Sequence, residues 1–232
     1  MSAEWECIVV GGGAAGLSAA LVLGRARRRT LVVDADSQSN RSASVIGGLL
    51  GYDQRPPAEL YAVGRRELAA YPSVEYRFGE VVGGTPVGDR LELYLDGGQR
   101  LRARRVLLAT GMQYCPPDLP GVGPLWGKSV FQCPFCHGWK MRDRRLAALG
   151  SGEEAVHAGL MLRGWSKDVV LLTDGPARID AQQCRLLETA GVTVDERRLV
   201  ELVGRAGQLT ALVFADGTRM ERDGLLVSAP LR

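Results

Sequence analysis

Residues 6–16 read ECIVVGGGAAG, an apolar run that leads directly into closely spaced glycines. The run is rich in β-branched residues and predicts a buried parallel strand. Gly11, Gly13 and Gly16 have the spacing of the dinucleotide fingerprint. In that fingerprint the first glycine makes a tight turn, the second admits a pyrophosphate and the third lets helix and strand pack closely. The predicted nucleotide-binding loop therefore consists of Gly11, Gly13, Ala14, Ala15 and Gly16.

The residues after this loop support the same interpretation. Residues 30–33 form a second apolar run, and Asp34 ends it. A carboxylate about 20 residues beyond the loop binds a ribose hydroxyl in dinucleotide-binding units. The plain alternative is a glycine-rich turn without a ligand. The order of strand, glycines, helix, strand and acid favours the nucleotide site.

A second copy of the pattern lies in the other half of the chain. Residues 146–149 predict a strand, and Gly150, Gly152 and Ala155 follow it with fingerprint spacing. Asp174 stands at the end of the next apolar run, where a carboxylate repels the 2′-phosphate of NADPH and accepts from a free ribose hydroxyl. The predicted fold is therefore α/β, with two Rossmann-like βαβ domains.

Turn-forming residues divide the rest of the chain. Residues 115–121 read CPPDLPG and predict a linker between domains. Residues 91–95 and 100–103 flank Asp96-Gly97-Gly98 and predict a β-hairpin. Residues 106–109 predict a separate short buried strand.

Residues 133–138 read CPFCHG and stand between the two nucleotide patterns. Two cysteines three residues apart form either a redox dithiol or half of a zinc site. A structural zinc needs four ligands, and the sequence has neither a second CxxC nor an HxxxH. We therefore predict redox chemistry at Cys133 and Cys136 and no metal. If the second cysteine opens a helix, the helix N-terminus stabilises its thiolate.

His137 follows the second cysteine directly. Imidazole titrates near neutral pH, so we predict that His137 passes protons to or from the thiols. The alternative is a surface histidine packed on the start of a helix.

Composition narrows the function further. The chain has 232 residues, 46% of them hydrophobic and 24% charged, as in ordinary soluble domains. A net charge of +3 is too small to indicate nucleic-acid binding. The sequence shows no signal peptide and no convincing transmembrane run. Five cysteines are an odd number for a secreted disulfide framework, so we expect a cytoplasmic protein with one redox pair.

The whole chain resembles the low-molecular-weight thioredoxin reductases and the related dithiol oxidases. The resemblance rests on four features, which are Gly11–Gly16 with Asp34, the turn Ala109-Thr110-Gly111, the pair Cys133 and Cys136, and Gly150–Ala155. It implies a flavoprotein that exchanges electrons between a substrate dithiol or disulfide, the cysteine pair and FAD. The second redox partner would be NADH, NADPH or oxygen.

The resemblance also implies a domain plan and further site residues. Residues 1–118 would bind FAD, and residues 119–232 would form an inserted NAD(P)-binding-like domain that carries the cysteines. The turn Ala109-Thr110-Gly111 and Val82 would lie near FAD. Cys136 would face the flavin, and Cys133 would react with the substrate.

Three departures from the family pattern affect this interpretation. His137 stands where bacterial thioredoxin reductases carry an aspartate, and it resembles the dithiol oxidases. The strand before Asp174 lacks the basic cluster that binds the NADPH phosphate, although Arg178 remains within reach of one. Family members continue after this point to complete the FAD domain with a Gly-Asp motif, which the sequence lacks. We therefore expect an incomplete FAD domain.

Two function classes follow from these features. The first is an FAD-dependent dithiol–disulfide oxidoreductase that acts on a small dithiol or disulfide, or on a thioredoxin-like protein, as a homodimer. The second is a truncated fragment that binds nucleotides or partners without turnover. Neither nucleic acid nor a membrane is an expected partner.

Overall fold

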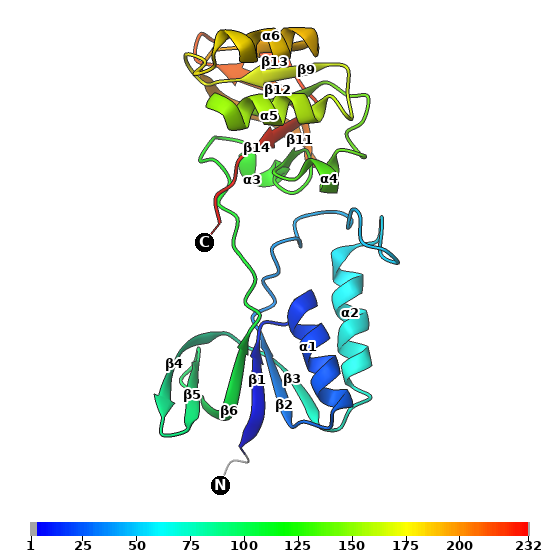
Figure 1. Ribbon diagram of the computed structural model, residues 1–232, viewed down its shortest axis with the longest axis vertical. Helices are drawn as coiled ribbons and strands as arrows, with labels where there is room; N and C mark the ends of the chain where they lie inside the picture. The colour runs from blue at the N-terminus through cyan, green and yellow to red at the C-terminus, as the bar shows by residue number, and fades with distance from the viewer. Residues whose placement is uncertain (1–3, 232) are drawn as a thin grey trace. The chain divides into compact units, whose positions relative to one another are not determined.

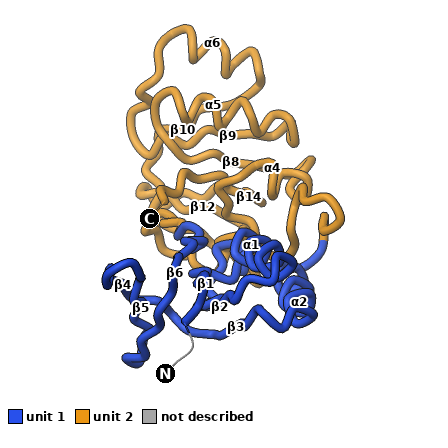
Figure 2. Tube along the Cα trace, turned by 60° about the horizontal axis from the view of Figure 1, so that its bottom comes forward, with its two compact units in different colours: residues 1–41, 55–113 blue, residues 42–54, 114–232 orange. Residues whose placement is uncertain are grey.

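The computed structural model describes residues 4–231 (Figure 1). Contacts divide the chain into two compact units (Figure 2). Unit 1 contains the described residues up to Arg41 together with residues 55–113, and unit 2 contains residues 42–54 and 114–231. The domain boundary between residues 118 and 119 stays a prediction, and the contacts group the segment 42–54 with unit 2.

Unit 1 is built on a six-stranded sheet with the order β3-β2-β1-β6-β5-β4. Its strands are β1 (Trp5–Val10), β2 (Thr30–Asp34), β3 (Val74–Phe78), β4 (Val81–Val87), β5 (Arg90–Leu95) and β6 (Arg100–Leu108). The β3-β2-β1-β6 portion is parallel, whereas β4, β5 and β6 pair antiparallel. The predicted hairpin is confirmed, with Leu93 opposite Leu101. The separate strand over residues 106–109 is wrong, because β6 continues without a break to Leu108.

Two helices cover the parallel part of this sheet, α1 (Ala14–Arg25) and α2 (Pro57–Leu68) (Figure 1). Val9 and Val32 of the central strands are fully buried, as the apolar runs predict. Leu17 and Ala20 of α1 pack against them together with Tyr61 of α2. This core fixes the carboxyl ends of β1 and β2 beside the start of α1.

Unit 2 contains a second parallel sheet with the order β10-β9-β8-β14-β7, and a three-stranded antiparallel sheet. Its strands are β7 (Val130–Phe131), β8 (Leu146–Leu149), β9 (Val169–Leu172), β10 (Val192–Asp195), β11 (Leu199–Arg205), β12 (Gln208–Phe214), β13 (Arg219–Glu221) and β14 (Gly224–Val227). Its helices are α3 (Val122–Leu125), α4 (Pro134–His137), α5 (Gly152–Leu162) and α6 (Ala181–Thr189). The predicted α/β class with two Rossmann-like units is confirmed.

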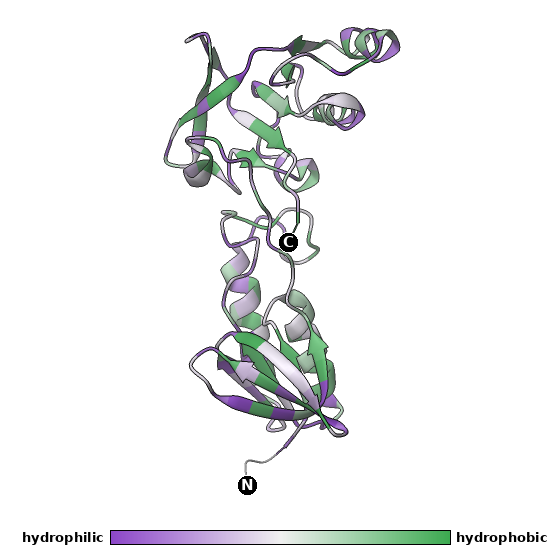
Figure 3. Cartoon of the chain, turned by 90° about the vertical axis from the view of Figure 1, so that its left-hand side faces the viewer, coloured by the Kyte–Doolittle hydropathy of each residue, from purple (hydrophilic) through white to green (hydrophobic). Residues whose placement is uncertain are grey.

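The parallel sheet of unit 2 is buried on both faces. One face packs on the antiparallel sheet through residues such as Leu172, Leu212 and Phe214. The other face packs on α5 and α6 through Leu162 and Leu187. Figure 3 shows strongly hydrophobic strands within both units, in line with this burial.

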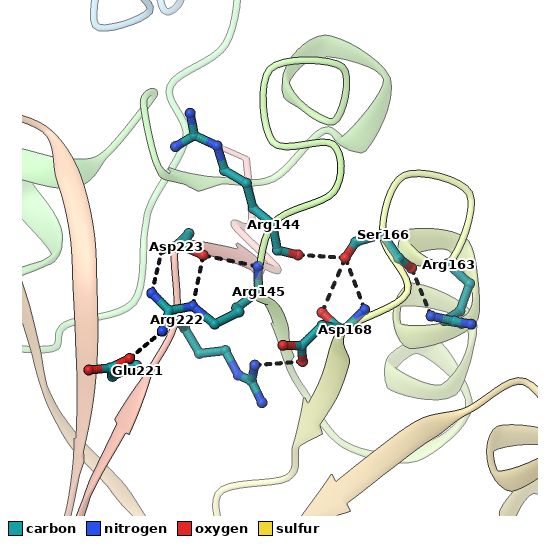
Figure 4. A network of polar contacts seen from close by, with 8 residues as sticks. All are labelled: Arg144, Arg145, Arg163, Ser166, Asp168, Glu221, Arg222 and Asp223. Carbon is teal, nitrogen blue, oxygen red and sulfur yellow. Dashed lines mark hydrogen bonds and ion pairs between the residues drawn. The ribbon is translucent and has the colours of Figure 1, made fainter.

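A polar network ties together the starts of β8, β9 and β14 in unit 2 (Figure 4). The Ser166 hydroxyl donates to the Arg144 carbonyl at 2.5 Å and accepts the Asp168 amide at 3.0 Å. The Arg145 guanidinium donates to both carboxylate oxygens of Asp223, at 2.9 and 3.0 Å. These bonds connect the amino ends of the three strands. The second glycine loop lies at the opposite, carboxyl end of β8.

No helix among residues 4–231 combines the length and the apolarity that crossing a bilayer requires. In the same described residues, no three or more His, Cys, Asp or Glu side chains gather as a set that could hold a metal ion.

Candidate functional site

A cavity of about 580 Å³ lies in unit 1 at the carboxyl ends of β1, β2 and β6. Ligands of open parallel sheets bind at this end of the strands. Most of the site residues predicted for FAD line the cavity, namely Gly11, Gly13, Ala14, Ala15, Asp34, Ala109, Thr110 and Gly111. The structure thus brings together two predicted motifs that lie far apart in the sequence.

The glycine loop has the geometry that requires glycine. Gly11 has a φ of +108°, and a Cβ at this position would overlap the carbonyl oxygen of Ala109. A Cβ at Gly16 would overlap the carbonyl oxygen of Gly11, so α1 can approach β1 only through glycine. The first turn of α1 has no side-chain cap and no acidic residue. Its free backbone N–H groups therefore suit a phosphate.

Asp34 is almost fully buried at the end of β2, with 3% of its surface exposed. Its carboxylate accepts hydrogen bonds from the amides of Gly12 and Asp36, each at 3.1 Å. It also accepts from the Gln38 amide nitrogen at 3.1 Å and from the Tyr76 hydroxyl. Burial and this carboxylate raise the pKa of Tyr76. Asp34 thus organises the cavity wall through four protein donors.

Gln38 carries the unsatisfied polar atom of this cavity. Its amide nitrogen faces the Asp34 carboxylate, which can only accept, so its side-chain oxygen is left as a buried acceptor without a partner. Buried acceptors without partners are rare, and here the atom belongs to a residue that lines the cavity. A ligand hydroxyl would satisfy it.

Sequence reasoning missed Gln38, Asn40, Tyr61 and Tyr76. The Tyr61 hydroxyl donates to the Asn40 side-chain oxygen at 2.6 Å, and both residues line the cavity. Gln38 and Asn40 follow the end of the second strand, and polar residues at strand carboxyl ends are a usable signal for a site. Tyr61 comes from α2 and Tyr76 from β3, and only the tertiary fold brings Tyr61 to the cavity and Tyr76 to Asp34.

Two predicted residues lie differently from the rest. Gly16 lies beneath the loop and supports it instead of lining the cavity. Val81 lines the cavity, whereas the Val82 side chain is 62% exposed. Side chains alternate along a strand, so only one of two neighbours faces the cavity. The role of Val82 stays a prediction.

The residues of this cavity fit FAD. An uncapped helix N-terminus behind glycines suits the pyrophosphate. The unsatisfied Gln38 oxygen suits a ribose hydroxyl. The cavity volume lies in the range of small-molecule sites.

The second glycine loop opens a smaller cavity of about 460 Å³ in unit 2. Gly150 and Ala155 line it, and Gly152 has a φ of +67° at the start of α5. In contrast to α1, the first turn of α5 carries two carboxylates, Glu153 and Glu154. Negative charge there already occupies the favourable end of the helix dipole and repels a pyrophosphate. This loop therefore fits a dinucleotide less well than the loop of unit 1.

Asp174 follows the end of β9, as predicted, but its carboxylate has a structural partner. It accepts the Leu199 amide at 2.7 Å, and its φ is +53°. The side chain anchors the start of β11 at the strand end where a ribose would lie. The predicted contact between Asp174 and a ribose hydroxyl would use the carboxylate lone pairs that do not accept the Leu199 amide.

The cysteines lie at the start of α4 in unit 2, and both are free thiols. The helix begins after Cys133 and not at Cys136, so the expectation that the second cysteine opens a helix is wrong. Pro134 occupies the first helical position, which it favours because its φ is fixed and it lacks an N–H. The Cys133 sulfur consequently accepts the Cys136 amide at 3.2 Å.

The two sulfurs of the pair are not equivalent. Partial burial and the hydrogen bond to Cys133 raise the pKa of Cys136 to about 12. Cys136 therefore keeps its proton near neutral pH, and the Cys133 sulfur accepts the Cys136 amide.

His137 lies beside the cysteines and is held by backbone groups. Its ring stacks on Phe131 at 5.2 Å between centroids. Nε2 lies 3.1 Å from the Gly127 carbonyl oxygen, and Nδ1 lies 3.4 Å from that of Cys133. Burial lowers the pKa of His137, while the Gly127 and Cys133 carbonyls act in the opposite direction. Proton transfer between His137 and a thiol stays a prediction.

Comparison with known proteins identifies the family. The family model described as pyridine nucleotide-disulphide oxidoreductase matches residues 5–229. The chain belongs to the pyridine nucleotide-disulphide oxidoreductase family. Members of this family are enzymes that depend on FAD, with NAD(P)H as the electron donor. Within the family the chain is thioredoxin reductase-like, as the resemblance predicted.

Individual relatives support this assignment. The chain is 30% identical to the thioredoxin reductase tcpT of Claviceps purpurea over 98% of its own length and 74% of that protein. The thioredoxin reductase aclD of Aspergillus oryzae is also 30% identical, over 97% of this chain and 74% of that protein. Among solved structures, an oxidoreductase from Agrobacterium tumefaciens is 36% identical with a TM-score of 0.92, over 99% of this chain and 76% of that chain.

Proposed function

We propose that this family member catalyses dithiol–disulfide exchange, with Cys133 and Cys136 as the redox pair and FAD held by unit 1. The observation that carries the proposal is the placement of two free thiols at the start of α4, where the Cys133 sulfur accepts the Cys136 amide. Two free thiols three residues apart are the groups that dithiol–disulfide exchange requires.

The residues of unit 1 would hold the flavin nucleotide. The loop from Gly11 to Gly16 and the start of α1 would bind its pyrophosphate. Asp34 and Gln38 would receive a ribose hydroxyl, and the turn Ala109-Thr110-Gly111 would lie against the cofactor. When bound, FAD supplies an acceptor and donor of two electrons.

The dithiol would act in two exchange steps. A substrate disulfide is attacked by the Cys133 sulfur, and a mixed disulfide forms. Cys136 then loses its proton and attacks the Cys133 sulfur, which releases the reduced substrate and closes the internal disulfide. The reverse sequence oxidises a substrate dithiol. His137, one residue beyond Cys136, is the proposed carrier of the proton that leaves or enters the thiol.

The charges of unit 2 favour oxidation of a substrate dithiol over reduction of a substrate disulfide. Glu153, Glu154 and Asp174 place carboxylates around the second nucleotide loop. They disfavour NADPH more than NADH, because NADPH carries the additional phosphate. Oxygen is then the alternative electron acceptor. The substrate is a small dithiol or disulfide, or a thioredoxin-like protein, and the active form is a cytoplasmic homodimer.

The visible absorption spectrum tests the proposal. The purified chain, with FAD added, is mixed anaerobically with a small dithiol such as dithiothreitol. We expect flavin bands that bleach, and bleaching that is lost in Cys133→Ser and Cys136→Ser. Cys184→Ser, which changes a half-buried cysteine of α6, serves as the matched control. Full dithiol turnover by Cys133→Ser, or a chain that takes up no FAD, would refute the proposal.

A further inference from the structure

The segment 42–54 belongs to unit 2 and packs against the cysteine turn. A Cβ at Gly47 would lie 2.5 Å from the carbonyl oxygen of Cys136 and 3.2 Å from its Cα, so the two backbones are in contact. The Gly48 amide donates to the Asp53 carboxylate at 2.8 Å, and the Gln54 amide donates to the Ile46 carbonyl at 2.9 Å. These bonds close the segment into a compact turn beside the redox pair.

Lys140 joins this turn to the redox pair. It lies four residues after Cys136, and its amide bonds to the His137 carbonyl at 3.0 Å, so the helical winding continues beyond α4. Gly47 of the segment 42–54 contacts the Cys136 backbone, and Val45 lies two residues before it. The Lys140 ammonium group donates to the Val45 carbonyl at 3.3 Å. The segment 42–54 therefore holds the cation on the side of the winding that carries Cys136.

The electrostatics of this arrangement centre on Lys140 and its ionisable neighbours. Burial lowers the pKa of Lys140, while the Asp53 carboxylate and Cys136 act in the opposite direction. Burial and Cys133 raise the pKa of Cys136, and the charge of Lys140 acts against them. Lys140 also contributes to the lowered pKa of His137. Among these neighbours, Lys140 is the group that favours a negative sulfur at Cys136.

We propose that Lys140 is a positioning residue, which stabilises the negative charge left on the Cys136 sulfur when a substrate thiolate opens the internal disulfide. The inference rests on the proposed dithiol–disulfide exchange. In this step the substrate sulfur bonds to the Cys133 sulfur, and the bond between the Cys133 and Cys136 sulfurs breaks. The electron pair of that bond leaves on Cys136, so one negative charge moves from the substrate to Cys136.

The test measures how fast Cys136 reacts with iodoacetamide as a function of pH, in the full chain with Cys133→Ser. Lys140→Met removes the charge at similar length, and Lys140→Arg keeps it. We expect Lys140→Met to slow the reaction at pH 8, where Lys140 still carries its charge, because losing a nearby opposite charge raises the pKa of a thiol by about 1 unit. Below the thiol pKa this is a roughly tenfold slower reaction. Lys140→Arg should restore most of the rate.

Cys184 in the same samples is the internal control, since it lies on α6 and its alkylation should not change. Lys140→Gln provides a second neutral variant if Lys140→Met folds poorly, as judged by circular dichroism. Identical profiles for the neutral and arginine variants would overturn the role of Lys140. The measurement needs neither FAD nor substrate, so a chain that shows the rate difference without exchange activity refutes the proposed function and not the charge effect.

Discussion

Replacing Asp34 by Asn separates a structural role of this carboxylate from a role in binding the cofactor. The wild-type carboxylate accepts from four donors, the amides of Gly12 and Asp36, the Gln38 side chain and the Tyr76 hydroxyl. An amide oxygen accepts about two of them, while the new NH₂ group faces the remaining donors. Two hydrogen bonds to a charged acceptor, each of roughly 1.5 kcal/mol, are then lost.

We therefore expect Asp34→Asn to destabilise the chain by about 3 kcal/mol before any cofactor is added. For a chain of this size the melting temperature should fall by roughly 6–12 °C. The assay is thermal unfolding followed by circular dichroism, first without FAD and then with it. The control is Asp36→Asn, because Asp36 is exposed and its pairing with Arg41 is worth about 0.5 kcal/mol.

An unchanged melting temperature of Asp34→Asn without FAD, combined with a strong loss of FAD affinity, would contradict this reasoning. In that case the carboxylate would serve the ribose and would not hold the cavity wall. Equal losses in Asp34→Asn and Asp36→Asn would contradict it as well, since burial would then make no difference.

Three further predictions concern unit 2. Changing Glu153 and Glu154 together to Gln should strengthen NADH binding about fivefold, because it removes roughly 1 kcal/mol of repulsion at the start of α5. A fluorescence titration measures the affinity, and no change would refute the charge argument. The pKa of His137 is lower in the folded than in the unfolded chain, so the unfolded state binds more protons and stability should fall as the pH decreases below about 6.5. Urea unfolding between pH 5 and 7.5 measures this slope, which His137→Gln should flatten. Ser166→Ala removes a donor to the Arg144 carbonyl and an acceptor for the Asp168 amide. We expect the free energy of unfolding in urea to fall by about 1–2 kcal/mol, and no change would mean that the network of Figure 4 is dispensable.

Local patterns were sufficient to predict the nucleotide loops and the hairpin. The rule that a buried strand, glycines and a helix follow one another depends on neighbouring residues, so the spacing of Gly11, Gly13 and Gly16 is enough to identify the loop. The two-glycine turn at Gly97 and Gly98 likewise fixes the pairing of β5 with β6. In both cases the backbone conformation itself requires glycine.

Other features depend on contacts between distant residues, and the sequence did not predict them. Tyr76 meets Asp34 only because β3 lies beside β2. The sequence did not predict that β6 continues, because the exposed residues Arg102, Arg104 and Arg105 interrupt the apolar pattern without ending the strand. The helix α4 begins at Pro134, two residues before Cys136, because proline favours the first helical position and Cys133 then becomes the N-cap.

The path of the segment 42–54 affects how this chain can be divided or recombined. The chain passes between the two units three times, after Arg41, after Gln54 and after Gln113. A single proteolytic cut near Gln113 would release residues 114–232 from covalent attachment, and only their contacts with the segment 42–54 would then hold unit 2 together. If recombination replaced only residues 114–232, the incoming redox turn would pack against a Gly47 and Val45 from a different parent protein. Unit 2, which carries the cysteines, therefore consists of two separate stretches of sequence. Substitutions in one stretch must stay compatible with the other.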